Sequence, residues 1–329
     1  MEKSWLRRPL IAAAIAALAL VLIVGAPVWV MALSFADLAR GRMRFPLVRF
    51  TAFGLCWALL ETAGVAIAFW LFCTGRAKSV DSNYALQKWW TSRLIDSLRV
   101  TVGLKITVEG ADSLGSGPFV AFCRHASLAD SIMSAWVVAS HAGLRPRYVL
   151  KKELKLDPCL DILGHRLPNY FIDRESSDIA SELVGIEQMA NGLSDIDCCV
   201  IFPEGSRASA TKRERTLQSL RDRSPERALR LEGLKYLIAP KPSGALALLS
   251  AAPEANVLTM WHSGFDGFDT FRGILRHLGS ARARIHVKVE AHKRETIGTG
   301  EQFVAWLDKQ WVEMDKAVAR QIAIDVVKK

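Results

Sequence analysis

The sequence has no paired-cysteine motif. None of its cysteines stands in a C-x-x-C arrangement; they are Cys56, Cys73, Cys123, Cys159, Cys198 and Cys199. Structural zinc sites and secreted disulfide frameworks both depend on such paired spacings. The sequence therefore predicts no metal site, and it favours a reducing, cytosol-facing location for the main domain.

Several other signals are missing. No G-x-S-x-G elbow surrounds Ser127 or Ser206, which disfavours a serine nucleophile of the thioesterase kind. The chain shows neither an internal repeat nor a low-complexity segment. Its net charge of +10 suits an anionic partner, but no basic stripe alternates with exposed aromatic residues as in nucleic-acid binders. An acidic membrane surface is the favoured partner, and nucleic acid is not expected.

Charge is absent from one long stretch near the N-terminus. Residues Leu10–Ala36 carry none, and Phe50–Cys73 carries only Glu61. A membrane-spanning helix needs about 20 apolar residues, so both runs are long enough. A signal peptide would not explain the second run. We expect a membrane-anchoring helical hairpin over residues 1–78, with Glu61 protonated, facing the partner helix or near an interface.

The orientation of this hairpin stays open. Basic residues occur both in its short connection and at its outer ends, so the positive-inside rule gives no single answer. The connection contains Arg40, Arg42, Arg44 and Arg49, and the outer ends contain Arg7, Arg8, Arg76 and Lys78. The hairpin either crosses the bilayer or dips into one leaflet. In both cases the N-terminus and the main domain lie on the same side.

Strand-like and helical segments alternate after the hairpin, which predicts an α/β domain with a mixed sheet over residues 79–329. A helix is expected over Val80–Val100. The expected strands are Lys105–Val108, Pro118–Cys123, Tyr148–Lys151, Asn169–Ile172, Cys198–Phe202, Tyr236–Ala239, Asn256–Met260 and Arg284–Val289. The expected helices are Leu128–Ala139, Asp178–Met189, Ser243–Ala251 and Gln302–Ile324, with the basic stretch Thr211–Lys235 also helical.

Polar residues cluster at the ends of three apolar strands, where ligands collect in α/β sheets. The clusters are His125 with Asp130, Asp173 with Arg174, and the run Glu204, Gly205, Ser206 and Arg207. If His125 ends a strand and Asp130 opens the next helix, the carboxylate can hold the imidazole tautomer that leaves a basic ring nitrogen. Ser127-x-x-Asp130 also has the pattern of a helix capping box.

The second and third clusters, taken alone, read as a surface ion pair and a capped turn. Together with the first they suit attack by a hydroxyl on a carbonyl near a phosphate. Arginine offers a bidentate fork to phosphate, and Gly205 permits close backbone approach.

The ordered set resembles the glycerolipid acyltransferase family, which includes lysophosphatidic acid acyltransferases. The family's histidine and aspartate, separated by four residues, match His125 and Asp130. Its second block ends in Asp-Arg, matched by Asp173-Arg174, and its third, Phe-Pro-Glu-Gly-Thr-Arg, is matched by residues 202–207 with Ser206 for Thr. A Lys-Glu-Leu common in the family matches residues 152–154. The resemblance covers residues 105–266.

The resemblance implies a reaction as well as a fold. His125 would be the general base and Asp130 its orienting acid, while Arg174, Glu204, Gly205, Ser206 and Arg207 would bind the substrate. The acyl donor would be acyl-CoA or acyl carrier protein, the acceptor a lysophospholipid such as 1-acylglycerol-3-phosphate, and no cofactor is implied. The enzyme would be an integral or monotopic membrane protein of phospholipid biosynthesis with a cytoplasmic-facing catalytic domain, at the inner membrane if bacterial.

Two departures from the family pattern affect the acceptor. Arg124 replaces the Asn that often precedes the histidine, and the fourth block fits either residues 237–240 or residues 257–260. The acceptor could therefore be another lysophospholipid or a lyso-aminolipid. From other classes, a catalytically idle membrane adaptor and a membrane-tethered nucleic-acid binder remain alternatives. His262 is expected to be a buried, hydrogen-bonded histidine near the acyl pocket rather than a second base.

Overall fold

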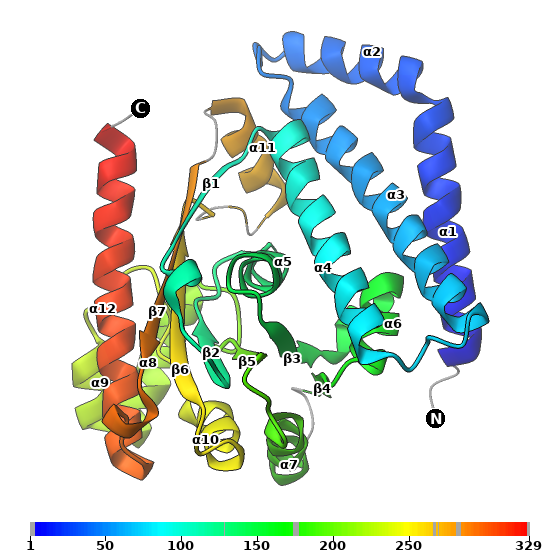
Figure 1. Ribbon diagram of the computed structural model, residues 1–329. Helices are drawn as coiled ribbons and strands as arrows, with labels where there is room; N and C mark the ends of the chain where they lie inside the picture. The colour runs from blue at the N-terminus through cyan, green and yellow to red at the C-terminus, as the bar shows by residue number, and fades with distance from the viewer. Residues whose placement is uncertain are drawn as a thin grey trace. The chain divides into compact units, whose positions relative to one another are not determined.

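The structure is a computed structural model (Figure 1), and it describes residues 4–127, 129–173, 178–265, 268, 270–280 and 284–327. The chain divides into two compact units. We call residues 1–105, 150–174 and 270–283 the helical unit, and residues 106–149, 175–269 and 284–329 the sheet unit. Both units are discontinuous in sequence. The domain boundary expected after residue 78 stays a prediction.

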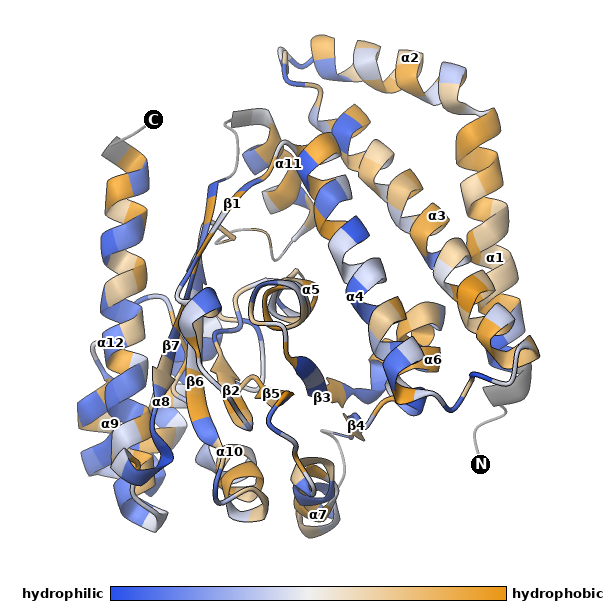
Figure 2. Ribbon diagram, in the orientation of Figure 1, coloured by the Kyte–Doolittle hydropathy of each residue, from blue (hydrophilic) through white to orange (hydrophobic). Residues whose placement is uncertain are grey.

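Long apolar helices dominate the helical unit. Its elements are α1 (Ser4–Val24), α2 (Ala26–Leu38), α3 (Pro46–Cys73), α4 (Val80–Ser97), the π-helical turn η1 (Leu98–Val102), the 3-10 turn η4 (Lys152–Leu156), α6 (Pro158–Arg166), β4 (Tyr170–Ile172) and α11 (Phe271–Ser280). Helix α3 packs against α1, α4 and α6. Apolar residues cover α1, α2 and α3 (Figure 2). Two of the described helical segments, Arg7–Val24 and Pro46–Cys73, are long and apolar enough to cross a membrane.

The first apolar run is not one helix, as the sequence alone suggested, but two. Helix α1 ends at Val24 and α2 begins at Ala26, with Pro27 in the first turn of α2. Proline has no backbone N–H, and its ring would clash with the carbonyl of Ile23 in a continuous helix. The Trp29 indole Nε1–H then donates to the Leu22 carbonyl over 2.8 Å, which ties the two helices together. The predicted hairpin is therefore a three-helix segment.

The sheet unit alternates strands with helices. Its strands are β1 (Lys105–Glu109), β2 (Phe119–Cys123), β3 (Arg145–Lys151), β5 (Asp197–Ile201), β6 (Asn256–Ser263) and β7 (Arg284–His292). Its longer helices are α5 (Asp130–Trp136), α7 (Ile179–Ala190), α8 (Ala210–Arg223), α9 (Pro225–Leu231), α10 (Pro242–Ala251) and α12 (Gly300–Val327). Short turns are η2 (Ala111–Ser113), η3 (Val137–His141) and η5 (Arg294–Thr296).

The sheet is mixed and has the strand order β1-β7-β6-β2-β5-β3-β4. Strand β2 runs parallel to β5 and β6, β3 runs parallel to β5, and β7 runs antiparallel to β6. Every residue of β2 and β5 is buried. A strand buried on both faces reads as a continuous apolar run, which is why these segments were predictable. The α/β class with a mixed sheet is confirmed.

Seven of the eight predicted strands are present, and residues 236–239 are the exception. Their backbone donors bind carboxylates instead of a neighbouring strand. The Asp315 carboxylate accepts from the N–H groups of Tyr236 and Leu237 over 2.7 and 2.8 Å, and the Glu204 carboxylate accepts from that of Ile238 over 2.9 Å. Side-chain carboxyl oxygens thus satisfy the backbone donors of a buried apolar segment that looks like a strand in sequence.

Candidate active site

A polar loop follows the carboxyl end of strand β2. The ladder with β6 continues one residue beyond β2, because the N–H of Arg124 donates to the Met260 carbonyl over 2.9 Å. The Arg124 guanidinium is 1% exposed and donates to the His262 carbonyl. This arginine, which stands where the motif usually has Asn, therefore binds the backbone of β6 itself. His125 follows at the point where the chain leaves the sheet.

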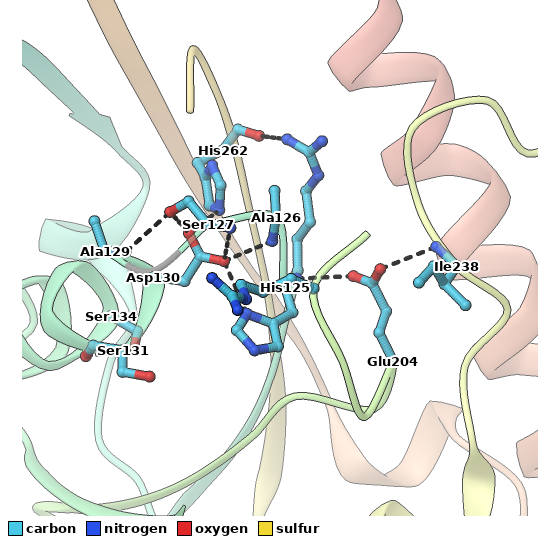
Figure 3. A network of polar contacts seen from close by, with 12 residues as sticks. His125, Ala126, Ser127, Ala129, Asp130, Ser131, Ser134, Glu204, Ile238 and His262 are labelled. Carbon is cyan, nitrogen blue, oxygen red and sulfur yellow. Dashed lines mark hydrogen bonds and ion pairs between the residues drawn. The ribbon is translucent and has the colours of Figure 1, made fainter. Parts of the chain in front are cut away.

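His125 and Asp130 meet as their spacing predicts. Asp130 is the first residue of α5, and its Oδ2 lies 3.0 Å from Nδ1 of His125 (Figure 3). The contact leaves Nε2 as the ring nitrogen able to take a proton when Nδ1 carries the hydrogen. The His125 side chain keeps 11% of its surface exposed, whereas that of Asp130 keeps 1%. The pair is thus a buried carboxylate in contact with a partly exposed imidazole.

The Asp130 carboxylate also organises its own loop. It accepts from the N–H groups of Ala126 and Ser127, and the Ser127 hydroxyl donates to its Oδ1. Ala129, not Ser127, is the residue before α5, and it makes no side-chain cap. Of the predicted capping box, only the contact from the Ser127 N–H to the Asp130 carboxylate is present, within a loop wrapped around that carboxylate.

A second imidazole lies on the other oxygen of the same carboxylate. Nε2 of His262, at the end of β6, is 3.1 Å from Oδ1 of Asp130, so Asp130 lies between two histidine rings (Figure 3). Electrostatic attraction between the His262 ring and the carboxylate contributes to this contact. Burial would raise the pKa of Asp130, but the two imidazoles lower it well below its ordinary value. Asp130 is therefore ionised. The expected burial of His262 is confirmed, and its place beside Asp130 was not expected.

Glu204 fastens two loops rather than facing outward. Its Oε1 accepts from the N–H of His125 over 2.8 Å and its Oε2 accepts from the N–H of Ile238 over 2.9 Å (Figure 3). The side chain is 2% exposed, and burial raises its pKa to about 8. Glu204 lies in the loop after β5, the strand beside β2, and from there it holds the backbone of His125 in place. Substrate contact by Glu204 remains a prediction.

The loop after Glu204 is held against the His125 loop. The N–H of Ala208 donates to the His125 carbonyl over 2.8 Å, and the N–H of Lys241 donates to the Pro203 carbonyl over 2.8 Å. Gly205 has φ +69°, and a Cβ placed there would lie about 3.5 Å from the Lys241 side chain. The glycine is needed for its left-handed backbone. Lys241, which the motifs did not single out, adds a cation beside this loop, near Ser206 and Arg207.

The second motif contributes one further predicted site residue. Arg174 lies outside the described residues. Its neighbour Asp173, in the helical unit, pairs with Lys152 over 2.7 Å.

Burial raises the pKa of the Cys123 and Cys198 thiols, which disfavours either as a nucleophile. Among the described residues no three metal-ligating side chains form a cluster.

The fold and the site together define a class: an α/β domain with a histidine–carboxylate pair at the end of its central parallel strand. Residues 105–253 match the family model described as Acyltransferase. The resemblance to acyltransferases seen in the motifs is thus confirmed over these residues.

A similar solved structure is the 1-acyl-sn-glycerophosphate (LPA) acyltransferase PlsC from Thermotoga maritima. The match has a TM-score of 0.46 and 16% identity, and it covers 80% of this chain and 95% of that chain. A comparison with curated protein sequences finds no match. At this identity and TM-score the likeness carries no argument, so the chemistry below rests on the residues of this chain.

Proposed function

We propose that the protein transfers a fatty acyl group from acyl-CoA or acyl carrier protein to a lysophospholipid hydroxyl. The first acceptor to test is 1-acylglycerol-3-phosphate, which would give phosphatidate. The observation that carries the proposal is the His125–Asp130 pair, with its acid buried and its imidazole partly open. A family domain over residues 105–253 supports the reaction class.

In the proposed reaction the acceptor hydroxyl gives its proton to Nε2 of His125 as its oxygen attacks the thioester carbonyl. Asp130 stabilises the imidazolium that forms, because its ionised carboxylate stays against Nδ1. Collapse of the tetrahedral intermediate breaks the carbon–sulfur bond, and His125 returns the proton to the leaving thiolate. Such general-base assistance contributes about 10²–10⁴-fold. No acyl-enzyme forms in this scheme.

We assign the acceptor's phosphate to basic side chains. Arg207 follows the loop that is tied to His125, and Lys241 packs beside Gly205 in the same loop. Arg174 is proposed for the same role from its position in the second motif. Arginine guanidinium and lysine ammonium groups bind a phosphate more strongly than a neutral headgroup.

The contacts of α3 favour a hairpin that dips into one leaflet. Near the start of α3, the Arg49 guanidinium donates to the Thr101 and Leu278 carbonyls, and near its end the Ala68 carbonyl accepts from Arg166. These contacts are about 28 Å apart along the helix, close to the roughly 30 Å of a hydrocarbon core. A membrane-crossing α3 would place η1 or α11 on the side opposite α6, or inside the bilayer.

The reaction is tested with the full chain purified in detergent. It receives a long-chain acyl-CoA or acyl carrier protein with a panel of lysophospholipids, and thiol release and product lipid are followed together. His125→Ala runs in parallel. Product lipid that the variant fails to make supports the mechanism, and the best acceptor names the substrate. Thiol release without product lipid indicates a thioesterase. No turnover with any donor favours the idle adaptor.

Membrane topology is tested by side-specific labelling in sealed vesicles, after the native cysteines are replaced by serine. Met43→Cys probes the connection before α3, and Lys316→Cys probes the exposed face of α12. A hairpin in one leaflet exposes both probes on the same side. Labelling of the two probes from opposite sides would show that the hairpin crosses the bilayer.

A further inference from the structure

A basic hollow lies in the helical unit, at the connection between α2 and α3. Its volume is about 670 Å³, and η1 and the first residue of β1 complete its wall. The side chains that carry the argument are Arg44, Arg49, Arg99, Lys105, Met43 and Val100. Four of these are cationic, and no residue that lines the hollow is acidic.

Arg49, one of the cations that line the hollow, is held by backbone carbonyls. The Arg49 guanidinium donates to the backbone carbonyls of Thr101, Val102 and Leu278, so its position does not depend on a bound anion. Gly103 has φ +67°, and a Cβ there would come within 3.0 Å of the Arg49 guanidinium. The glycine therefore makes room for the arginine. A cation fixed in advance binds an anion at a lower entropic cost than a mobile one.

The other cations are accessible to a ligand. Arg44 and Lys105 are exposed, and neither has an acidic partner within the described part of the chain. Arg99 shares the carboxylate of Asp96 with Arg93, over 3.2 and 3.3 Å respectively. One exposed carboxylate thus serves two arginines, and the charge of the hollow stays positive.

Apolar side chains at the hollow favour a lipid over a soluble anion. Met43 is 73% exposed and Val100 is 84% exposed. Helix α2, which leads into the connection, exposes Met31 and Phe35 at 71% and 73%. Apolar surface directly beside a cluster of cations is the pattern of a surface placed at the headgroup level of an anionic membrane.

We propose that this hollow binds the phosphate of an anionic membrane phospholipid, separately from the acyl-transfer site. Arg49 and Lys105 would contact the phosphate, Arg44 and Arg99 would flank it, and Met43 and Val100 would lie against the acyl chains. The site would fix the helical unit on a membrane surface. It does not depend on acyl transfer, because nothing in it requires turnover.

The test uses the delipidated full chain in a neutral detergent, without an acyl donor. Phosphatidylglycerol is added, and native mass spectrometry measures the lipid bound; phosphatidylcholine is the zwitterionic comparison. The variant Arg44→Ala with Lys105→Ala removes two exposed cations. Lys316→Ala with Arg320→Ala removes one lysine and one arginine from exposed positions of α12 and is the matched control. Arg44→Lys with Lys105→Arg preserves the charge.

We expect phosphatidylglycerol to bind more tightly than phosphatidylcholine, and the Arg44→Ala, Lys105→Ala variant to bind it about 25-fold more weakly, since each of the two basic side chains at an anionic surface contributes about fivefold. The control and the charge-preserving variant keep wild-type binding. Bound lipid should also slow amide hydrogen exchange over residues 98–105.

Three results would overturn the proposal. Equal losses in the tested variant and the α12 control would mean that only net charge matters. Displacement of the lipid by inorganic phosphate at comparable concentration would make the hollow a site for free phosphate. Equal binding of the two lipids would leave no headgroup site. Because turnover plays no part in the readout, failure of the acyltransferase assay would not change any of these results.

Discussion

Two buried aspartates, one in each unit, are neutralised in different ways. Asp161 in α6 is fully buried and binds the guanidinium groups of Arg7 and Arg8 over 3.1 and 2.7 Å, and its Oδ1 lies 3.1 Å from Nδ1 of His165. Asp130 in α5 is 2% exposed and lies between the imidazoles of His125 and His262. Both carboxylates are ion-paired, and the nature of the partner separates their roles.

An arginine keeps its proton at every physiological pH, whereas an imidazole gains and loses one near neutrality. Arg7 and Arg8 give Asp161 permanent counter-charges that hold α1 to α6 at every physiological pH, although the His165 imidazole also lies on this carboxylate. Asp130 pairs only with imidazoles among the described residues, and one of them is partly open to solvent, so its network can take up a proton. Burial of a carboxylate thus does not identify a catalytic acid; the protonation chemistry of its partner does.

The Asp130→Asn substitution should have the largest effect, a loss of turnover. An amide cannot stabilise the imidazolium of His125, so turnover should fall by about 10²–10⁴-fold. The measurement is product formation per folded molecule, with folding followed by circular dichroism. Asp161→Asn is the matched control, because it makes the same change in the arginine-bound network. Wild-type turnover in Asp130→Asn would remove the histidine–carboxylate mechanism.

Glu204 gives the pH-dependent prediction. Burial raises its pKa to about 8 from an ordinary value of 4.5, so the folded state holds this proton more tightly than the unfolded state. The stabilisation is complete below about pH 4.5 and is lost as the pH rises through 8, a change on the order of 5 kcal/mol.

The Tm of the wild type, followed across this interval, should fall relative to that of Glu204→Gln, whose amide does not titrate. Glu254→Gln, at a surface turn, is the control and should follow the wild type. Parallel pH curves for Glu204→Gln and the wild type would show that Glu204 is ionised throughout and that hydrogen bonds from His125 and Ile238 outweigh its burial.

Asp161→Asn should act on stability. The amide leaves Arg7 and Arg8 without a counter-charge, and breaking a fully buried pair costs about 3–5 kcal/mol. Because these arginines are partly exposed, we expect about 2 kcal/mol, measured as a lower Tm in detergent. Turnover per folded molecule should not change. A loss of turnover at unchanged Tm would contradict the purely structural role of this network.

The parts of the fold and the site that depend on residues close together in the chain were predictable from the sequence. Strands β2 and β5 are continuous apolar runs, and the five-residue spacing of His125 and Asp130 fits a strand end followed by the first turn of a helix. The three motifs also mark which strand ends carry polar residues. In each case the residues that determine the structure are neighbours in the chain.

Contacts between distant residues were not predictable in the same way. Residues 236–239 look like a strand because nothing near them reveals that Asp315 accepts from their N–H groups. His262 is 132 residues from Asp130, and only the β2–β6 pairing brings them together. The break between α1 and α2 at Gly25 has a local cause, because Pro27 interrupts the helix. The uniformly apolar composition of this run nevertheless suggested a single helix.

His262→Gln is the smallest and most informative change. Glutamine keeps a polar side chain next to Asp130 but does not titrate, so the carboxylate charge acts on His125 alone. We expect kcat to fall about tenfold, equivalent to about 1.4 kcal/mol of barrier, through poorer positioning of Asp130. The acidic limb of the pH profile of kcat/KM should move to higher pH, because an unshared carboxylate stabilises the imidazolium of His125 more strongly. His286→Gln on β7, whose ring packs on Trp261, is the matched control and should leave the profile unchanged. A lower Tm with an unmoved pH profile would reduce His262 to a packing residue.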